Sequence, residues 1–176
     1  MLNGLKIRQI AYYVNDIPKA IERHHAMFGS GPFFYAENMT FNVNYRGQDV
    51  EITHNAAFGQ WGSMQVELLN TQMGGPSIFH ELYPEGSGRE GIHHVAVIAD
   101  DLEATIAKAA EAGYPVVQDA YIPEMDLRIV MVDAVKDCGH FIEIYDNVPS
   151  VHHFYQSVED AAKGFSGEEL IRKMAL

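Results

Sequence analysis

Two stretches of this chain share one pattern and decide its fold: "QIAYYVNDIPKAI" (residues 9–21) and "HVAVIADDLEATI" (residues 94–106). Each begins as an alternating apolar strand, reaches an aspartate (Asp16 or Asp101) and continues as a short amphipathic helix. Apolar residues at every second position predict a strand, and an aspartate before a helical pattern is a favoured N-cap. The two stretches match without a gap, so the sequence predicts two copies of one structural unit.

The closing strands of the two units also match. "SMQVELLN" (residues 63–70) and "GHFIEIYDN" (residues 139–147) both place a glutamate between apolar residues. Between the helix and the closing strand, residues 41–56 and 114–133 leave room for a hairpin in each unit. Each unit is therefore predicted as β-α-β-β-β. The expected fold class is α+β, with tandem βαβββ modules forming a curved sheet around a shared cleft.

The order of these elements predicts the domain organisation. We expect one domain over residues 5–147, which contains module one (5–72), a Gly- and Pro-rich linker (73–90) and module two (91–147). Residues 148–176 follow as a C-terminal tail without a counterpart in module one, and their pattern predicts two short helices. In two places in the tail a serine is followed three residues later by an acidic residue, the spacing of a helix capping box.

Composition limits the partners and the compartment. The chain has 12 Lys and Arg against 24 Asp and Glu, a net charge of −12, which argues against nucleic acid or an anionic membrane surface as partner. Cys138 is the single cysteine, so no intramolecular disulfide is expected. The first residues lack a secretory signal, and no apolar run reaches the roughly 20 residues of a membrane span. We predict a soluble cytoplasmic protein with a small-molecule substrate.

Two adjacent histidines, His93 and His94, open the first strand of module two. Strand alternation predicts that their rings point in opposite directions, with His93 on the face of Val95 and Val97 that packs against the helix. His93 is therefore expected to be peripheral to any site. The same alternation turns four polar residues at equivalent positions of the repeat toward the helix-free face: Gln9, Glu67, His94 and Glu143.

These four side chains form a plausible metal-binding set. Two carboxylates, one imidazole and one amide oxygen suit a single borderline divalent ion such as Zn²⁺, Ni²⁺, Co²⁺ or Mn²⁺, and Fe²⁺ is less favoured. The two carboxylates would neutralise the charge of the ion, which lowers the cost of burying it. The sequence predicts a metal-lined cleft between the modules.

Four segments, "QIAYYVND", "MQVELL", "GIHHVAVIADD" and "GHFIEIYD", resemble in their order and spacing the vicinal oxygen chelate superfamily of glyoxalases, bleomycin resistance proteins and dioxygenases. The resemblance covers about residues 5–145. It implies the paired βαβββ fold and a metal cleft, and it places the ligands at the four positions named above. As a set they resemble the Gln/Glu/His/Glu ligands of eukaryotic glyoxalase I.

The subfamily stays open at this point. Bacterial glyoxalase I and methylmalonyl-CoA epimerase usually carry histidine where this chain has Gln9. However, "DVEITHNA" (residues 49–56) resembles the epimerase strand that bears a catalytic glutamate, which makes Glu51 a candidate base facing Glu143. Ring-cleaving dioxygenases use two histidines and a carboxylate, so this chain would need His54 or His140 to replace the missing histidine.

The predicted function is that of a metal-dependent lyase or isomerase, lactoylglutathione lyase-like or epimerase-like. Such an enzyme abstracts a proton next to a carbonyl through a metal-stabilised enediolate. Glu143 is the expected base, and Glu67 or Glu51 would return the proton. Two alternatives are a non-catalytic small-molecule binding protein on the same fold and an Fe(II)-dependent ring-cleaving dioxygenase. We expect a hydrophobic substrate or a thioester or thiol adduct, and the chain is compatible with a homodimer.

Overall fold

The structure, a computed structural model, describes residues 4–174 and contains the two predicted modules. Module one consists of β1 (Ile7–Tyr13), α1 (Ile17–Phe28), β2 (Phe33–Tyr45), β3 (Gln48–Trp61) and β4 (Met64–Asn70). Module two consists of β5 (Gly91–Ala99), α3 (Leu102–Glu111), β6 (Val116–Ile122), β7 (Leu127–Val132) and β8 (Phe141–Asp146). Short helices lie between these elements: α2 (Ile78–Leu82), a 3₁₀ turn (Pro123–Met125) and α4 (Val135–Cys138). The predicted α+β fold with tandem βαβββ units is confirmed.

The two long helices of the modules begin as the repeat predicts. The carboxylate of Asp16 accepts a hydrogen bond from the backbone N–H of Lys19 at 3.0 Å, and Asp101 accepts one from Ala104 at 2.9 Å. These caps satisfy one orphan N–H group of each first turn. Helix α1 ends at Gly29, whose φ of 68° is left-handed, a conformation that favours glycine.

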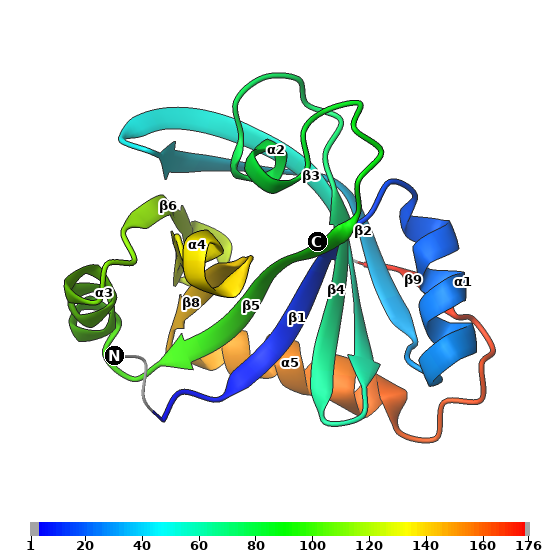
Figure 1. Cartoon of the computed structure of the whole chain (residues 1–176). Helices are drawn as coiled ribbons and strands as arrows, with labels where there is room; N and C mark the ends of the chain where they lie inside the picture. Colours follow the sequence, from blue (N-terminus) through cyan, green and yellow to red (C-terminus); the bar gives the residue numbers. More distant parts are fainter. Residues whose placement is uncertain (1–3, 175–176) are drawn as a thin grey trace.

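The sheet closes on itself. Its strand order is β3-β4-β1-β5-β8-β7-β6-β2-β9, and β2 also pairs with β3. The modules meet twice, where β1 pairs antiparallel with β5 and where Val43–Tyr45 of β2 pairs with residues 118–120 of β6. Figure 1 shows this arrangement, with the long β2–β3 hairpin curving over to module two. The helix-free faces of the two modules therefore enclose the interior of a closed sheet, which contains a cluster of buried side chains.

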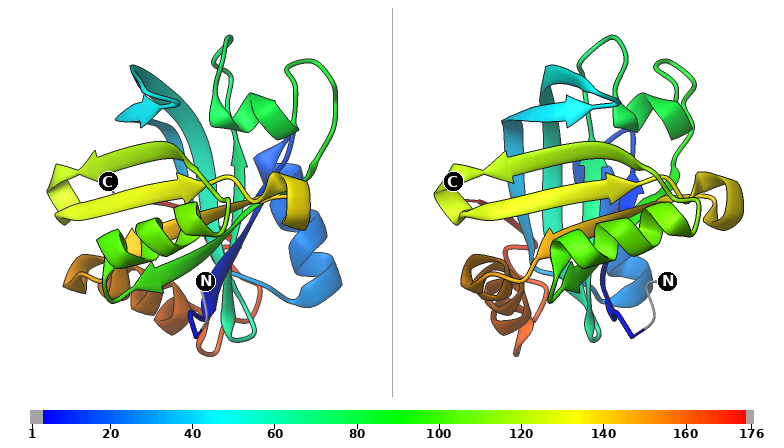
Figure 2. Two further views of the ribbon diagram at one scale, coloured as in Figure 1. Left: turned by 60° about the vertical axis from the view of Figure 1, so that its left-hand side comes forward. Right: turned by 90° about the vertical axis from the view of Figure 1, so that its left-hand side faces the viewer.

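The outer face of each module is covered by its own helix. Val66 and Leu68 of β4 pack against Ile17 and Ile21 of α1, and module two has an equivalent cluster between α3 and its strands. Figure 2 shows α1 and α3 on the outside of the sheet. The other face of the strands, which carries Ala11 and Ala96, points into the interior.

The C-terminal tail differs from the prediction of two helices. It forms one helix, α5 (Pro149–Ala162), and then a short strand, β9 (Ile171–Lys173), which pairs parallel with residues 33–35 of β2. The strand forms because the edge of β2 offers unpaired backbone groups that residues 171–173 can reach. Ser157 lies inside α5, where its hydroxyl donates to the carbonyl of Phe154, so it does not cap a helix.

Helix α5 crosses one end of the closed sheet, as Figures 1 and 2 show. Val151 and Tyr155 pack against Tyr145 of β8, and Phe154 meets Phe58 of β3 edge-on with ring centroids 5.0 Å apart. The tail therefore contributes side chains to the interior. Within residues 4–174, no helix has both the length and the apolar character needed to cross a membrane.

Candidate functional site

The four polar residues predicted to converge all lie in the interior, on strands that are neighbours in the order β4-β1-β5-β8. Gln9 comes from β1, Glu67 from β4, His94 from β5 and Glu143 from β8. Each is at most 7% exposed. For the two glutamates alternation selects the face directly: Val66 and Leu68, beside Glu67, pack with α1, and Ile142 and Ile144, beside Glu143, pack with α3.

His94 stands between the two carboxylates. Its Nε2 atom lies 3.4 Å from Oε2 of Glu67 and 3.3 Å from Oε2 of Glu143. In the described part of the chain, neither Nε2 of His94 nor Oε2 of Glu143 has a hydrogen-bond partner, although both atoms are buried. Buried polar atoms are normally paired, so these converging atoms mark a candidate ligand-binding point.

Burial and charge shift the three titratable groups in different directions. Burial by itself disfavours the imidazolium, but Glu143 and Glu67 raise the pKa of His94 to about 10. Burial raises the pKa of Glu67. Burial would also raise the pKa of Glu143, but the charge of His94 brings it below its ordinary value. The environment thus moves the pKa values of the two carboxyl groups apart, an arrangement suited to one proton acceptor and one proton donor.

Gln9 is held by a second glutamine. Its Nε2 donates to Oε1 of Gln65 at 2.6 Å, which leaves Oε1 of Gln9 buried and, among residues 4–174, without a hydrogen-bond partner. The amide therefore presents its oxygen, the atom a metal ion would bind. Among the described residues, no three or more His, Cys, Asp or Glu side chains lie close enough together to form a metal site. The contacts that the structure shows are those of His94 with each of the two carboxylates.

The prediction that His93 is peripheral is wrong. Ala11 of β1 pairs with His94 and Tyr12 pairs with Ile92, so His93 is an extra residue in a β-bulge. The bulge breaks the alternation and turns both rings inward. Nδ1 of His93 lies 2.9 Å from Nδ1 of His94, and His93 is fully buried. Its Nε2 lies 3.3 Å from the carbonyl oxygen of Ile78.

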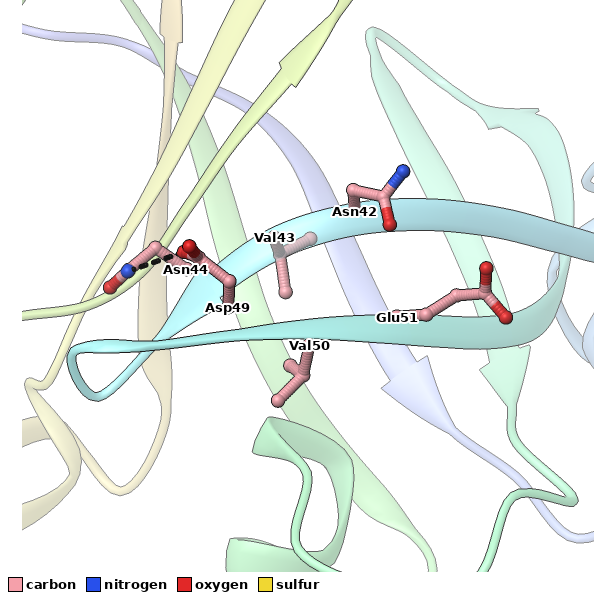
Figure 3. A pocket seen from close by; sticks show the side chains of 6 residues that line it. All are labelled: Asn42, Val43, Asn44, Asp49, Val50 and Glu51. Atoms are coloured by element: carbon pink, nitrogen blue, oxygen red, sulfur yellow. Dashed lines mark hydrogen bonds between the residues drawn. The ribbon is translucent and has the colours of Figure 1, made fainter.

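Glu51 does not face Glu143 as predicted. In β3 the interior position belongs to its neighbour Ile52, which is 3% exposed, whereas Glu51 is exposed and opposite Asn42 of β2. Figure 3 shows Glu51 and Val50 extending from opposite sides of β3 near the hairpin tip. Glu51 and Asn42 line an open pocket of about 270 Å³ there, away from the buried carboxylates.

Two further residues belong to the interior: His54, which the sequence suggested only as a substitute histidine ligand of a dioxygenase, and Tyr155, which was not identified from the sequence. His54 of β3 is half-buried, but its Nδ1 is buried and lacks a hydrogen-bond partner in the described chain, and burial lowers its pKa to about 4. His54 follows Ile52 by two residues in the same strand, so strand alternation puts both side chains on the interior face. Tyr155 of α5 also has a buried hydroxyl without a partner in residues 4–174. His140 contacts the carbonyl oxygen of Phe141 through Nδ1.

A sequence model described as "Glyoxalase/Bleomycin resistance protein/Dioxygenase superfamily" matches residues 8–131, well over half of the chain. The chain belongs to this superfamily. The match spans both modules from β1 to β7, and the resemblance noted in the sequence is confirmed at the level of the superfamily. No curated protein matches the chain.

Several solved structures share the fold. Methylmalonyl-CoA epimerase from Mycobacterium tuberculosis has a TM-score of 0.55 at 19% identity, over 84% of this chain and 91% of that chain. A hypothetical protein from Bacillus halodurans C-125 has a TM-score of 0.56 at 16% identity, over 83% and 96%. A Streptomyces coelicolor methylmalonyl-CoA epimerase in complex with 2-nitronate-propionyl-CoA has a TM-score of 0.54 at 20% identity, over 82% and 95%. At these identities the likeness concerns the fold.

Proposed function

We propose that this superfamily member is a divalent-metal-dependent isomerase that moves a proton on a carbon next to a carbonyl group. One observation carries the proposal: His94 Nε2 lies 3.4 and 3.3 Å from the carboxylates of Glu67 and Glu143. These groups come from both modules and converge in a buried interior, where such polar atoms need a partner.

The donor types and the two N–O distances at His94 fit a metal ion. Ligands bound tetrahedrally at about 2.0–2.1 Å from zinc lie roughly 3.4 Å from one another, close to both N–O distances of this site. His94, Glu67 and Glu143 would hold the ion, and the free oxygen of Gln9 would be the fourth donor. When bound, a divalent ion supplies Lewis-acid polarisation of the substrate's carbonyl oxygen.

The side chains of the site would carry the proton. Oε2 of Glu143 would accept the proton from the carbon next to the carbonyl, and Glu67, in its protonated form and not bound to the ion, would donate one to the substrate. Donation to the same carbon from the opposite face inverts its configuration, whereas donation to the neighbouring carbon isomerises the substrate. The closed interior excludes water from the carbanion-like species during this transfer.

Two substrate classes follow, each favoured by a specific observation. Structural neighbours include methylmalonyl-CoA epimerases, and the apolar surroundings of the site, with Phe58, Phe79 and Phe141, suit the acyl group of a thioester. We therefore propose epimerisation of an acyl thioester as the leading activity. The glutamine among the four donors favours the second candidate, isomerisation of a thiol adduct of a 2-oxoaldehyde.

The first test is metal binding, measured by calorimetric titration of the metal-free protein with Zn²⁺, Ni²⁺, Co²⁺ and Mn²⁺. We expect about one ion per chain for the wild type and for Glu51→Gln, whose substitution removes an exposed carboxylate outside the site. Glu143→Gln should lose this binding. A wild type that binds none of the four ions contradicts the proposal.

The second test measures the chemistry. Wild type with its metal is incubated in D₂O with methylmalonyl-CoA, or with the hemithioacetal of methylglyoxal and glutathione, and deuterium at the carbon next to the carbonyl is followed by NMR. Exchange with the first substrate supports epimerisation, and turnover of the second supports the glyoxalase-type reaction. Tight ligand binding without exchange would instead favour the non-catalytic binding protein.

A further inference from the structure

The contacts of the β-bulge point to a role for His93. We propose that His93 is a positioning residue that takes the Nδ1 proton of His94 in a hydrogen bond and so directs Nε2 of His94 toward Glu67 and Glu143. Its value for metal binding rests on the proposed function, whereas the hydrogen bond itself can be tested without a metal.

The first step concerns Nε2 of His93. This atom lies 3.3 Å from the carbonyl oxygen of Ile78, which can only accept a hydrogen bond. Nε2 of His93 must therefore carry a hydrogen atom. If it did not, two lone pairs would face each other in a fully buried position, without a hydrogen bond for either group.

The second step concerns the two Nδ1 atoms. The ring of His93 is buried between Phe79 and Phe141, with both ring centroids 5.3 Å away, and such surroundings disfavour an imidazolium. A neutral ring protonated on Nε2 has a lone pair on Nδ1. At 2.9 Å this lone pair accepts the hydrogen on Nδ1 of His94. The donation holds whether or not Nε2 of His94 also carries a proton.

The bulge that brings the rings together is supported by the linker between the modules. The hydroxyl of Tyr83 donates to the carbonyl of Ile92 at 2.7 Å, next to the bulged residue. Tyr83 approaches Gly91 so closely that a Cβ there would lie 2.7 Å from its hydroxyl oxygen, and Gly91 has a φ of 156°. A larger residue at position 91 would displace Tyr83. The linker thus holds His93 from two sides, at Ile78 and at Ile92.

The consequence is a preset ligand atom. Metal-binding histidines generally donate their other ring N–H to a neighbouring acceptor, which fixes the tautomer and the ring orientation. His93 is that acceptor for His94. Without it, a His94 ring that has lost one proton to bind a metal could keep the remaining hydrogen on Nε2, where it would block the lone pair that the ion needs.

The direct test is NMR of metal-free wild type labelled with ¹⁵N in histidine. We expect a scalar coupling across an N–H···N hydrogen bond between Nδ1 of His94 and Nδ1 of His93, and a His93 ring that carries its hydrogen on Nε2. His94→Gln, which removes the donor, should abolish the coupling and assign it. A missing coupling in wild type, or a His93 ring with its hydrogen on Nδ1, overturns the proposal.

The second test measures metal affinity in variants of His93. His93→Leu should bind metal about 10- to 100-fold more weakly, the usual cost of losing such a partner. His93→Asn, whose side-chain oxygen can replace Nδ1 as acceptor, should recover most of the affinity. His153→Asn, at an exposed position of α5, is the matched control.

The outcomes separate this inference from the proposed function. Unchanged metal affinity in both His93 variants overturns the positioning role. If His93→Leu does not fold, the coupling in wild type and the affinity of His93→Asn still decide. If no protein binds metal but the coupling is present, the function fails while the hydrogen bond between the two histidines is supported.

Discussion

The two modules present their site residues in the same backbone register but support them differently. In module one Ala11 is paired with Glu67, and in module two Ala96 is paired with Glu143, so each glutamate projects beside a small residue. These pairs are equivalent in the sequence repeat. The next inward-facing pair is where the modules diverge.

In module one this next pair is Gln9 with Gln65, and in module two it is His94 with Phe141. Gln65 accepts the amide N–H of Gln9 and leaves the Gln9 oxygen free. The side chain of Phe141 has no acceptor atom for the N–H of His94. Nδ1 of His93 lies within hydrogen-bond distance of Nδ1 of His94 and takes that role. Gln65, on the paired strand, and His93, in the bulge, therefore have equivalent roles. Each accepts a hydrogen bond from an N–H group of a site residue, which leaves the other polar atom of that residue (Oε1 of Gln9 or Nε2 of His94) free to bind a ligand.

The modules also share a bulge at equivalent positions. Arg8 is the extra residue of β1, as His93 is of β5. Arg8 is exposed, with its guanidinium 5.3 Å from the ring centre of Tyr155, whereas His93 is fully buried. The repeat thus preserves the irregularity of the backbone, and the elements outside the repeat, α5 and the linker, decide what the bulged side chain contacts.

The largest expected effect comes from breaking the carboxylate pair. Glu67→Gln and Glu143→Gln should each weaken metal binding by more than about 100-fold and lower the rate of proton exchange by about 10²- to 10⁴-fold, the range for removing a general acid or base. Affinity is measured by titration and exchange by deuterium uptake. Wild-type metal affinity in Glu67→Gln would mean that module two alone holds the ion.

The sequence predicts the convergence of the four residues because strand alternation and the repeat both act locally. Gln9, Glu67, His94 and Glu143 reach the interior as predicted. The contacts of His93 could not be predicted in this way, since they are made with a linker that the repeat does not contain.

Glu51 and the tail were mispredicted for related reasons. Side chains of β3 alternate between the interior and the solvent, and Ile52 occupies an interior position. Glu51, the residue before it, therefore points outward. Residues 171–173 become a strand because the edge of β2 is free for pairing, a tertiary effect that local propensity does not contain. The local pattern thus selects the face of a strand. Residues distant in sequence decide what a bulged side chain contacts and whether a strand edge is paired.

A smaller effect is expected from the partner of Gln9. Gln65→Leu removes the acceptor of its N–H and should weaken metal binding by about 10-fold, the lower end for such partners. Gln65→Glu keeps an obligate acceptor and should retain affinity. Titration of both variants makes the comparison with His93→Leu and His93→Asn direct. Equal losses in Gln65→Leu and Gln65→Glu would contradict an orienting role for Gln65.

Tyr155 tests whether the tail contributes only packing. Its hydroxyl is buried and lacks a partner in the described residues, so Tyr155→Phe should raise the free energy of unfolding by about 1 kcal/mol, measured by urea denaturation. The phenyl ring keeps the contacts with Tyr145 and Phe154. A decrease of similar size would mean that the hydroxyl has a partner, such as an ordered water, in solution.

The smallest expected effect concerns the long hairpin of module one. Arg46, in its turn, binds Glu81 of α2 through two hydrogen bonds of 2.8 and 2.7 Å, and Tyr45 also donates to Glu81. Burial alone would raise the pKa of Glu81, but these bonds bring it below the ordinary value of 4.5. The resulting stabilisation is present above about pH 4.5 and is lost as the pH falls through the folded-state pKa.

Because Glu81 is partly exposed, its ion pair should contribute no more than about 1 kcal/mol. Glu81→Gln should therefore lower the melting temperature slightly at pH 7, and the difference from wild type should shrink toward pH 3. Glu51→Gln, on the same hairpin, is the control. A difference that grows as the pH falls would contradict the argument. The hairpin of module two offers the contrast. Arg128 pairs with Asp119 of its own hairpin and with Glu103 of α3 in the same module, whereas Arg46 joins module one to the linker that supports His93.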